Sequence, residues 1–293
     1  MRASSLTWGG CTIPGDGRVP AVAVSLTGPT AAHARAQARH AIDAGADVLE
    51  LRVDLLEEVD ALVAFTEAPG EESSTTDSMV VTTAAAQVLE CLRRMADVVD
   101  VTPLLLTCRT AAEGGRARLD DSGYGALLCS VLDELAGWEP GRRPSAIDVE
   151  VQRDCLPQVS EQAHGLGIDV VASFHDFKTT PADDVLEDVL SRMASEGADL
   201  AKIAVWPTSA DDVARLLGMC ARAAAAPGEG TGLGLPVAAM SMGALGAVSR
   251  VAPVFGSALT FAVVPDEQGE TQASAPGQLP IQDVRRCLEL LRA

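Results

Sequence analysis

The stretch Leu200-Ala-Lys-Ile-Ala-Val205 is a short aliphatic run in which the only polar side chain is a lysine. A run of this length without polar alternation is typical of a strand buried on both faces, as in a parallel sheet covered by helices. Lys202 is unusual there, because the chain has only two lysines among its 22 basic residues. An arginine stays charged, whereas a lysine buried among aliphatic side chains can lose its proton and attack a carbonyl. We therefore predict that Lys202 is a covalent catalyst; the alternative is a lysine whose stem packs while its ammonium group reaches water.

Similar runs rich in Val, Ile and Leu recur along the chain and alternate with longer amphipathic segments, which predicts βα units around a parallel sheet. We expect eight strands, at 22–27, 48–53, 104–108, 147–151, 170–174, 200–205, 237–242 and 259–264. We expect helices at 30–44, 84–97, 117–136, 157–166, 182–196, 210–225, 245–254 and 281–292. Eight strands each followed by a helix predict the α/β class and a single (β/α)8 TIM barrel. An open doubly wound sheet could also hold eight strands, but no Gly-x-Gly-x-x-Gly motif follows the first strand to support a dinucleotide fold.

Three segments fall outside this repeat. Residues 1–19 are rich in Gly and Pro and predict a flexible N-terminal extension, so that the barrel domain spans 20–293. Residues 67–78 read as an acidic surface insertion. Residues 265–280 form a long polar loop after the last strand, of the kind that often serves as a lid over a site. None of these segments divides the chain into two cores.

Composition narrows the class of partner. The formal net charge of −19 argues against nucleic acid, which needs a basic face, and against anionic membranes. Seven cysteines without a Cys-x-x-Cys pair or a metal spacing predict reduced thiols, no metal and a cytoplasmic location. The N-terminus has no apolar signal region, and no apolar stretch reaches transmembrane length. A small-molecule ligand is the expected partner.

Polar residues gather at the carboxyl ends of the predicted strands, which meet at one mouth in a barrel. They are Ser25, Glu50, Arg52, Arg109, Asp148, Glu150, His175 and Lys202. Glu50 and Arg52 are two residues apart and so share a face of their strand. Charged side chains that point into a barrel need partners or a ligand; taken singly, each could be an interior ion pair or a rim charge. Met240 and Met242 are expected to be apolar walls of a pocket at this mouth.

His175 ends the strand that precedes the Lys202 strand. A lone strand histidine is usually structural, but an imine mechanism needs a base of near-neutral pKa close to the lysine. Glu113, in the run Cys108-Arg-Thr-Ala-Ala-Glu-Gly-Gly115, could orient the imidazole as carboxylates do in other base–orienter pairs. We therefore predict that His175 is the general acid and base.

Three arginines predict an anion pocket within this acidic protein. Arg52, Arg109 and Arg250 offer guanidinium groups, which suit a carboxylate better than ammonium groups do. Ser274 and Gln278 of the predicted lid can donate hydrogen bonds to the same anion. The expected substrate is therefore a small anion.

Several motifs occur in order along the chain. They are Leu49-Glu-Leu-Arg-Val-Asp54, Cys108-Arg-Thr-x-x-Glu-Gly-Gly115, Ser173-Phe-His-Asp-Phe177, Ala201-Lys-Ile-Ala-Val205, Met240-Ser-Met-Gly243, Ser249-Arg250, Phe255-Gly-Ser257, Thr260-Phe261 and Ser274-Ala-Pro-Gly-Gln278. With these motifs the chain resembles, from about Val22 to its C-terminus, the type I 3-dehydroquinate dehydratases of the shikimate pathway. The resemblance implies dehydration of 3-dehydroquinate to 3-dehydroshikimate, without a cofactor or a metal, by a protein that is expected to be a homodimer.

The resemblance also implies roles for individual residues. Lys202 would form an imine with the ring ketone, His175 would transfer protons, and Glu113 would orient His175. The substrate-binding residues would be Arg250, Ser274 and Gln278 for the carboxylate, Glu50, Arg52 and Arg109 for the ring hydroxyls, and Ser25, Met242 and Phe261 for the rest of the pocket. A protonated imine is an electron sink that acidifies the neighbouring C–H bond, which agrees with a metal-free reaction.

Three other readings stay open at this point. A class I aldolase would share Lys202 and the barrel, but would favour a phosphate site that the 265–280 loop hardly offers. A metal-dependent lyase or isomerase could use Glu50, Asp148 and His175 as ligands, which leaves Lys202 unexplained. A non-catalytic metabolite sensor on the same scaffold is the third.

Overall fold

The computed structural model describes residues 5–15, 19–63, 78–99, 102–225, 232–265 and 272–291. The strands are β1 (Leu6–Trp8), β2 (Cys11–Ile13), β3 (Ala21–Leu26), β4 (Val48–Arg52), β5 (Leu104–Thr107), β6 (Ala146–Glu150), β7 (Asp169–Asp176), β8 (Leu200–Val205), β9 (Val237–Ser241), β10 (Leu259–Val263) and β11 (Leu279–Pro280). The α-helices are α1 (Ala31–Asp43), α2 (Glu57–Val63), α3 (Ser78–Val99), α4 (Asp121–Leu135), α5 (Leu156–Gly165), α6 (Asp183–Ser195), α7 (Ala210–Ala223) and α8 (Ile281–Leu290). Short 3₁₀ turns are η1 (Val53–Leu55), η2 (Ala111–Glu113), η3 (Pro140–Arg142), η4 (Val151–Arg153), η5 (Ala247–Arg250) and η6 (Pro253–Phe255).

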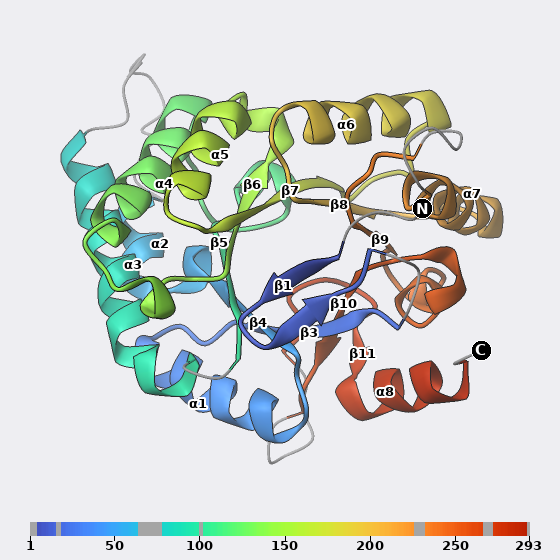
Figure 1. Cartoon of the computed structure of the whole chain (residues 1–293), viewed down its shortest axis with the longest axis horizontal. Coiled ribbons are helices and arrows are strands. Elements are labelled where there is room, and N and C mark those ends of the chain that lie inside the picture. The colour runs from blue at the N-terminus through green and yellow to red at the C-terminus, as the bar shows by residue number, and fades with distance from the viewer. Residues whose placement is uncertain are drawn as a thin grey trace.

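Nine strands form one parallel sheet, in the order β11-β10-β3-β4-β5-β6-β7-β8-β9. The sheet curls into a TIM-barrel-like fold with helices around it (Figure 1). An isolated parallel bridge from Val237 at the start of β9 to Ser257, just before β10, joins the two ends of the sheet. The eight predicted barrel strands are thus confirmed as β3 to β10, each within two residues of its expected ends, and the predicted fold class is correct.

The strands alternate between two apolar layers. Side chains that point outward pack against the surrounding helices in one large cluster. Side chains that point inward form a second cluster, which includes Ala23, Val48, Leu105, Val171 and Leu200. Farther along the same strands the inward positions become polar and charged, so the apolar part of the interior supports a charged mouth.

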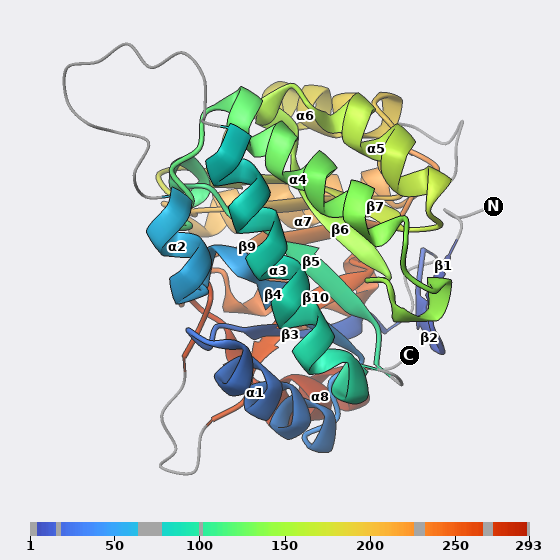
Figure 2. The same ribbon diagram turned by 90° about the vertical axis from the view of Figure 1, so that its left-hand side faces the viewer.

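The N-terminal segment closes the other end of the barrel. β1 and β2 form an antiparallel hairpin that lies opposite the βα loops (Figure 2). Trp8 and Ile13 are buried in the inner apolar cluster, and Trp8 Nε1 donates to Asp169 Oδ2 at 2.8 Å, at the start of β7. The prediction of a flexible extension is therefore wrong for residues 5–15, because two large side chains cover the apolar floor.

Two helix predictions also differ from the structure. The predicted helix at 245–254 is absent, and that segment forms the turns η5 and η6. The backbone of Gly246 approaches β9 so closely that a Cβ there would lie 2.3 Å from the carbonyl oxygen of Ser241, and Pro253 cannot continue a helix from the preceding residue. Conversely, α2 was not predicted; its Val59 and Val63 are buried one turn apart.

The remaining segment predictions fall partly outside the described residues. Of the 67–78 insertion only Ser78 is described, and it begins α3. Of the predicted lid, residues 266–271 lie outside the described part, whereas residues 272–280 lie at the barrel mouth. No helix within the described ranges is long and apolar enough to cross a membrane.

Candidate active site

Lys202 lies in the middle of β8 and points into the barrel, where it is 4% exposed. Its Nζ donates to Glu50 Oε1 at 3.2 Å and to Asp148 Oδ2 at 3.1 Å, and lies 4.5 Å from the centre of the Phe261 ring. Burial alone would raise the pKa of Glu50, but Lys202 and Arg52 outweigh it and hold the value below its usual range. The lysine thus sits on an apolar strand, as predicted, but beside two ionised carboxylates that the run 200–205 does not reveal.

Strand register brings these side chains to one level. Glu150 pairs with Ser173, and Ser173 pairs with Lys202, across three neighbouring strands. Asp148, two residues before Glu150, shares its inward face. Because the charged residues alternate with Val, Ile and Ala, each strand can bury its outward face against the helices while presenting polar groups to the interior.

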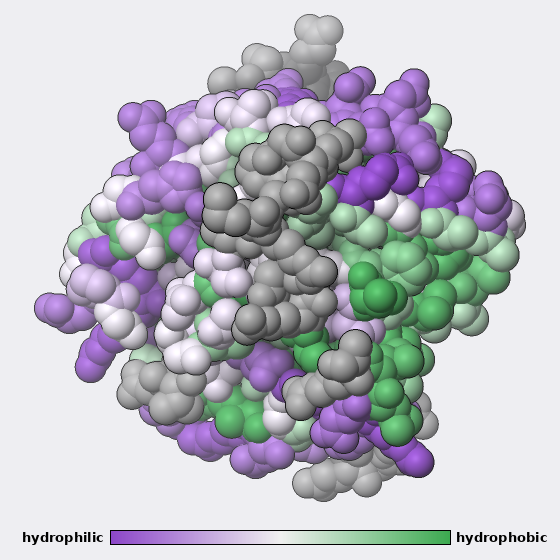
Figure 3. Space-filling model, turned by 45° about the vertical axis from the view of Figure 1, so that its right-hand side comes forward, coloured by the Kyte–Doolittle hydropathy of each residue, from purple (hydrophilic) through white to green (hydrophobic). Residues whose placement is uncertain are grey.

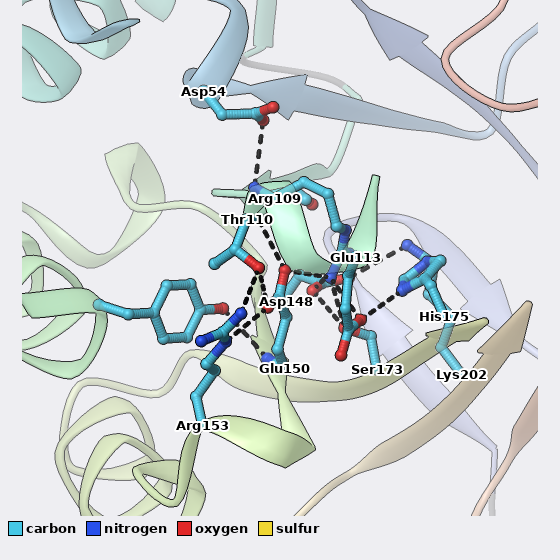
Figure 4. Close-up of polar contacts among 12 residues, drawn as sticks. Asp54, Arg109, Thr110, Glu113, Asp148, Glu150, Arg153, Ser173, His175 and Lys202 are labelled. Atoms are coloured by element: carbon cyan, nitrogen blue, oxygen red, sulfur yellow. Dashed lines mark hydrogen bonds and ion pairs between the residues drawn. The ribbon is translucent and has the colours of Figure 1, made fainter. Parts of the chain in front are cut away.

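Arg109 is the centre of the polar network in Figure 4. Its guanidinium donates to Asp148 Oδ1 at 2.7 Å, Ser173 Oγ at 2.9 Å, Glu150 Oε1 at 3.1 Å and Glu113 Oε2 at 3.5 Å. Burial alone would lower the pKa of Arg109, but Asp148 and Glu150 raise it well above its usual value. Arg109 is therefore an internal counterion rather than a free anion-binding group.

Arg52 is also engaged with a neighbour. Its Nε and a terminal nitrogen donate to the two oxygens of Asp54 at 2.9 and 2.8 Å. Asp54 is fully buried and also accepts from the backbone N–H of Arg109 and of Arg116. This carboxylate fixes Arg52 at the mouth and ties β4 to the loop after β5.

His175 and Glu113 form a buried pair. His175 Nδ1 and Glu113 Oε2 are 2.8 Å apart. Burial raises the pKa of Glu113 to about 8, with Glu150 adding to the shift and Arg109 opposing it. Burial also lowers the pKa of His175 well below its usual value, and Arg109 and Lys202 add to that effect. Both shifts disfavour charge, so at neutral pH the pair holds a shared proton between a neutral ring and a carboxyl group.

Arg250 has a different environment from the other two arginines. It is 2% exposed, and it donates only to the backbone oxygens of Phe261 at 3.4 Å and Pro276 at 3.1 Å, while its Nε has no partner in the described residues. Burial lowers its pKa to about 10. No acidic side chain of the described chain pairs with it. A buried guanidinium without a counterion has the charge and the N–H donors that suit an anion.

Three residues of the predicted lid, Ser274, Ala275 and Gln278, line the cavity at the mouth. Ser274 Oγ donates to Ser25 Oγ at 2.8 Å, and Gln278 Nε2 donates to Ser274 Oγ at 3.0 Å. Ser25 in turn donates to Glu50. These bonds connect the loop to the carboxylate that holds the lysine.

The mouth contains one small cavity that brings most of the predicted residues together. Its lining residues are Glu50, Arg52, Arg109, Glu113, Gly114, His175, Phe177, Lys202, Ala204, Met240, Arg250, Phe261, Ser274, Ala275 and Gln278. Ser25 and Met242 do not line it: Ser25 lies behind Glu50, and Met242 is fully buried.

Two contributors to the site were missed from the sequence. Asp148 was noticed at a strand end but was not recognised as a partner of Lys202, although its spacing from Glu150 was the signal. Phe177 follows His175 by two residues, and its ring packs so closely on Gly114 that a Cβ there would lie 2.3 Å from the ring. Gly114 has φ of +83°, a left-handed conformation that favours glycine.

Among the described residues, no group of three or more His, Cys, Asp or Glu side chains could hold a metal ion. Glu50 and Asp148, two of the ligands that the metal-dependent reading would need, are instead bonded to Lys202.

The fold and the cavity together define a TIM-barrel protein with a buried lysine, a histidine–carboxylate pair and, at the same mouth, an arginine that has no acidic partner among the described residues. The family model for "Type I 3-dehydroquinase" matches residues 22–293. The chain belongs to the type I 3-dehydroquinase family, and it is a hydro-lyase by class.

Relatives of known sequence agree with this assignment. The 3-dehydroquinate dehydratase of Klebsiella pneumoniae subsp. pneumoniae is 34% identical over 275 residues, which is 92% of each chain. That of Listeria monocytogenes serotype 4b is 34% identical over 281 residues, or 94% of each chain.

Solved structures also agree. The Geobacillus kaustophilus 3-dehydroquinate dehydratase superposes with a TM-score of 0.78 at 27% identity, covering 98% of this chain and 96% of the other. The Clostridium difficile type I enzyme, crystallised with covalently modified comenic acid, also gives 0.78, at 28% identity over 99% and 98% of the two chains.

Proposed function

We propose that this protein dehydrates 3-dehydroquinate to 3-dehydroshikimate through a Schiff base on Lys202, with His175 as general acid and base. The observation that carries the proposal is that Lys202, the His175–Glu113 pair and the unpaired Arg250 all line one cavity. A nucleophile, a base with its orienter and an anion-binding group are the parts that an imine-forming dehydratase of a carboxylate needs.

The reaction begins at the lysine. Lys202 passes one ammonium proton to Glu50 or Asp148, and the resulting amine attacks the ring ketone carbon. That proton then leaves with the ketone oxygen as water, so that the ammonium group and the ketone give a protonated imine and one water molecule. This cation stays beside Glu50 and Asp148, so the two carboxylates keep a positive partner throughout the covalent stage. The imine also withdraws electrons from the neighbouring C–H bond.

His175 then moves the proton. Nε2 takes a proton from the carbon next to the imine, and the electron pair moves into an enamine. The enamine expels the hydroxyl group of the next carbon, which leaves as water with the proton that His175 carried. Hydrolysis of the imine frees Lys202 and the product, so the balance is the loss of one water molecule.

Glu113 suits both halves of this cycle. As an ionised carboxylate it accepts the Nδ1–H of His175, which leaves Nε2 free to act as a base. Because burial raises the pKa of Glu113 to about 8, the pair also retains the proton that it has taken up until the hydroxyl group leaves. We therefore expect kcat/KM to rise with pH towards about 8 as the resting pair loses its shared proton.

The proposal is tested by trapping the imine. Incubation with 3-dehydroquinate followed by borohydride reduction should give a stable adduct that peptide mass spectrometry places on Lys202. Lys178 is the matched internal control, since it is the only other lysine and is exposed. An adduct on Lys178, or turnover without any adduct, would sink the Schiff-base assignment.

Arg250→Met should weaken substrate binding without destabilising the protein. A hydrogen bond to a charged group contributes about 1.5–3 kcal/mol, so we expect KM to rise roughly ten- to hundredfold. The free energy of unfolding, measured by denaturant titration, should stay within about 1 kcal/mol, because the guanidinium has no acidic partner in the described structure.

Arg109→Met is the matched comparison. Removing the cation that three carboxylates share should lower the free energy of unfolding by about 3–5 kcal/mol. An unchanged KM in Arg250→Met would contradict the role of Arg250 as the carboxylate-binding group.

We propose further that the protein is a cytoplasmic homodimer. All seven cysteines are free, which supports a reducing compartment. Figure 3 shows apolar side chains gathered on one side of the molecule, and three exposed aliphatic residues, Leu245, Val248 and Val254, lie between β9 and β10. An apolar surface of this kind supports contact with a second copy.

A further inference from the structure

Arg153 lies outside the cavity, in the turn after β6, and its side chain folds back towards the barrel. Nε donates to Glu150 Oε2 at 3.2 Å, one terminal nitrogen donates to Thr110 Oγ1 at 2.9 Å, and the other donates to Asp121 Oδ1 at 2.7 Å. The next residue, Asp154, has φ of +51°, a left-handed conformation that is uncommon outside glycine. The side chain of Arg153 is 15% exposed, and these three partners lie on the barrel or on α4.

Glu150 is held between two arginines. From inside the barrel, Arg109 donates to its Oε1 at 3.1 Å; from outside, Arg153 donates to its Oε2. Thr110 adds its backbone N–H at 2.7 Å and its hydroxyl at 2.6 Å. All of these contacts are made at once, so Glu150 divides its negative charge between Arg109 inside the barrel and Arg153 outside it.

The same nitrogen of Arg109 that contacts Glu150 continues to Glu113 at 3.5 Å, and Glu113 contacts His175 at 2.8 Å. Figure 4 shows this continuous line from Arg153 to His175. The contact from Arg109 to Glu113 is the longest in the line, and hydrogen bonds weaken steeply at such distances. It is therefore the contact that a change in charge at Glu150 would affect first.

The buried charges around Arg109 and Lys202 show why the contacts from Arg153 to His175 matter. Four buried carboxylates surround the two cations Arg109 and Lys202: they belong to Glu50, Glu113, Asp148 and Glu150. Arg153 adds a third positive charge beside Glu150 from outside the barrel, where it also bonds Asp121, and Arg250 lies across the cavity with no direct contact to these carboxylates. Without Arg153, Arg109 would be drawn to Glu150 and Asp148, and Glu113 would lose its only direct cationic contact in the described structure.

We propose that Arg153 is a positioning residue for the dehydration: by neutralising Glu150 from outside the barrel, it leaves Arg109 available to hold Glu113 against His175. The inference rests on the proposed function, because it assigns Arg153 an effect on the acid–base pair of that reaction. Arg153 itself does not line the cavity.

The charged groups that face this pair come from every neighbouring element. They are Arg109 before η2, Asp148 and Glu150 of β6, Arg153 of η4, Lys202 of β8 and Arg52 of β4, with Asp121 of α4 on the far side of Arg153. Removing one positive charge from this set raises the proton affinity of Glu113, so the pair would keep its shared proton to higher pH. The form in which His175 is a free base would then appear only at higher pH.

The test compares Arg153→Met, Arg153→Lys and the control Arg192→Met by the pH dependence of kcat and kcat/KM. Arg192 is a matched control, because it is an arginine that bonds Asp154 on the outside of the same turn and contacts none of the carboxylates around Lys202. In Arg153→Met the rising limb should move to higher pH by about one unit, which is a loss of roughly tenfold at pH 7 that shrinks to about twofold at pH 9 and disappears above about pH 10. KM should change little, since the substrate does not meet Arg153.

Arg153→Lys keeps the positive charge but loses the planar guanidinium, which bonds three partners at once. Its pH–rate profile should therefore lie between those of the wild type and Arg153→Met. Profiles that superimpose on the wild type, or a loss of equal size at every pH, would overturn the inference, because a merely structural role predicts the latter. Wild-type turnover and the borohydride adduct are measured in the same series. An inactive wild type would contradict the proposed function itself, whereas active wild type with unshifted variants would contradict only the role of Arg153.

Discussion

Lys202→Met should lose turnover by on the order of 10⁵-fold or more, which is the scale seen when a covalent nucleophile is removed. Methionine keeps much of the unbranched stem that fills β8 but cannot form an imine, so no route remains to the electron sink. Substrate should still bind, because Arg250, Ser274 and Gln278 are untouched. The measurements are kcat under saturating substrate, binding by calorimetry, and the absence of a borohydride adduct.

The substitution also changes stability, and this effect must be separated from the loss of chemistry. Without Lys202, Glu50 keeps Thr107 and Ser25 as partners, and Asp148 keeps Arg109, but both lose a buried cation. Breaking a buried ion pair costs about 3–5 kcal/mol, so the midpoint of denaturation should fall.

Lys178→Met is the control for Lys202→Met. Lys178 is exposed in the loop after β7, and its replacement should leave kcat and stability unchanged. A folded Lys202→Met protein that binds substrate and retains near wild-type turnover would show that the reaction does not pass through this lysine.

His175→Ala should separate imine formation from proton transfer. A positioned acid–base group contributes about 10² to 10⁴ in rate, so kcat should fall by that factor. The amine of Lys202 does not need His175 for its attack in the proposed mechanism, so the imine should form and accumulate. Borohydride reduction during steady state should therefore trap more adduct in the variant than in the wild type.

A suitable control for this variant is His164→Ala. His164 lies near the end of α5, is exposed, pairs with Asp199 at 2.8 Å and does not line the cavity. It should turn over at the wild-type rate. If His175→Ala formed no adduct at all, His175 would be needed before proton removal, and the order of steps proposed above would be wrong.

Much of the fold could be read from local patterns. Runs such as 200–205 and 170–174 mark strands because buried parallel strands need aliphatic side chains on both faces, and that requirement acts within a few residues. Glu50 and Arg52 were predicted to share a face from their spacing alone, and both line the cavity. The helix prediction at 245–254 was wrong because this segment is shaped by a tertiary contact: the backbone of Gly246 packs directly against Ser241 of β9. A local sequence pattern does not reveal such a contact.

The sequence by itself determined the eight strands, the polar side chains at their carboxyl ends and the family, because strand periodicity and motif spacing are local properties. Only the tertiary structure decided which charges meet. Lys202 and Glu50 are 152 residues apart, and their contact depends on the register of every strand between them. The tertiary structure also shows that the hairpin of residues 6–13 closes the barrel floor. It shows too that Arg153 reaches Glu150, because the turn after β6 folds back towards the barrel. Ion pairs between distant segments leave no periodic pattern in the sequence. Which charges pair is therefore determined by how the strands pack side by side in the curled sheet.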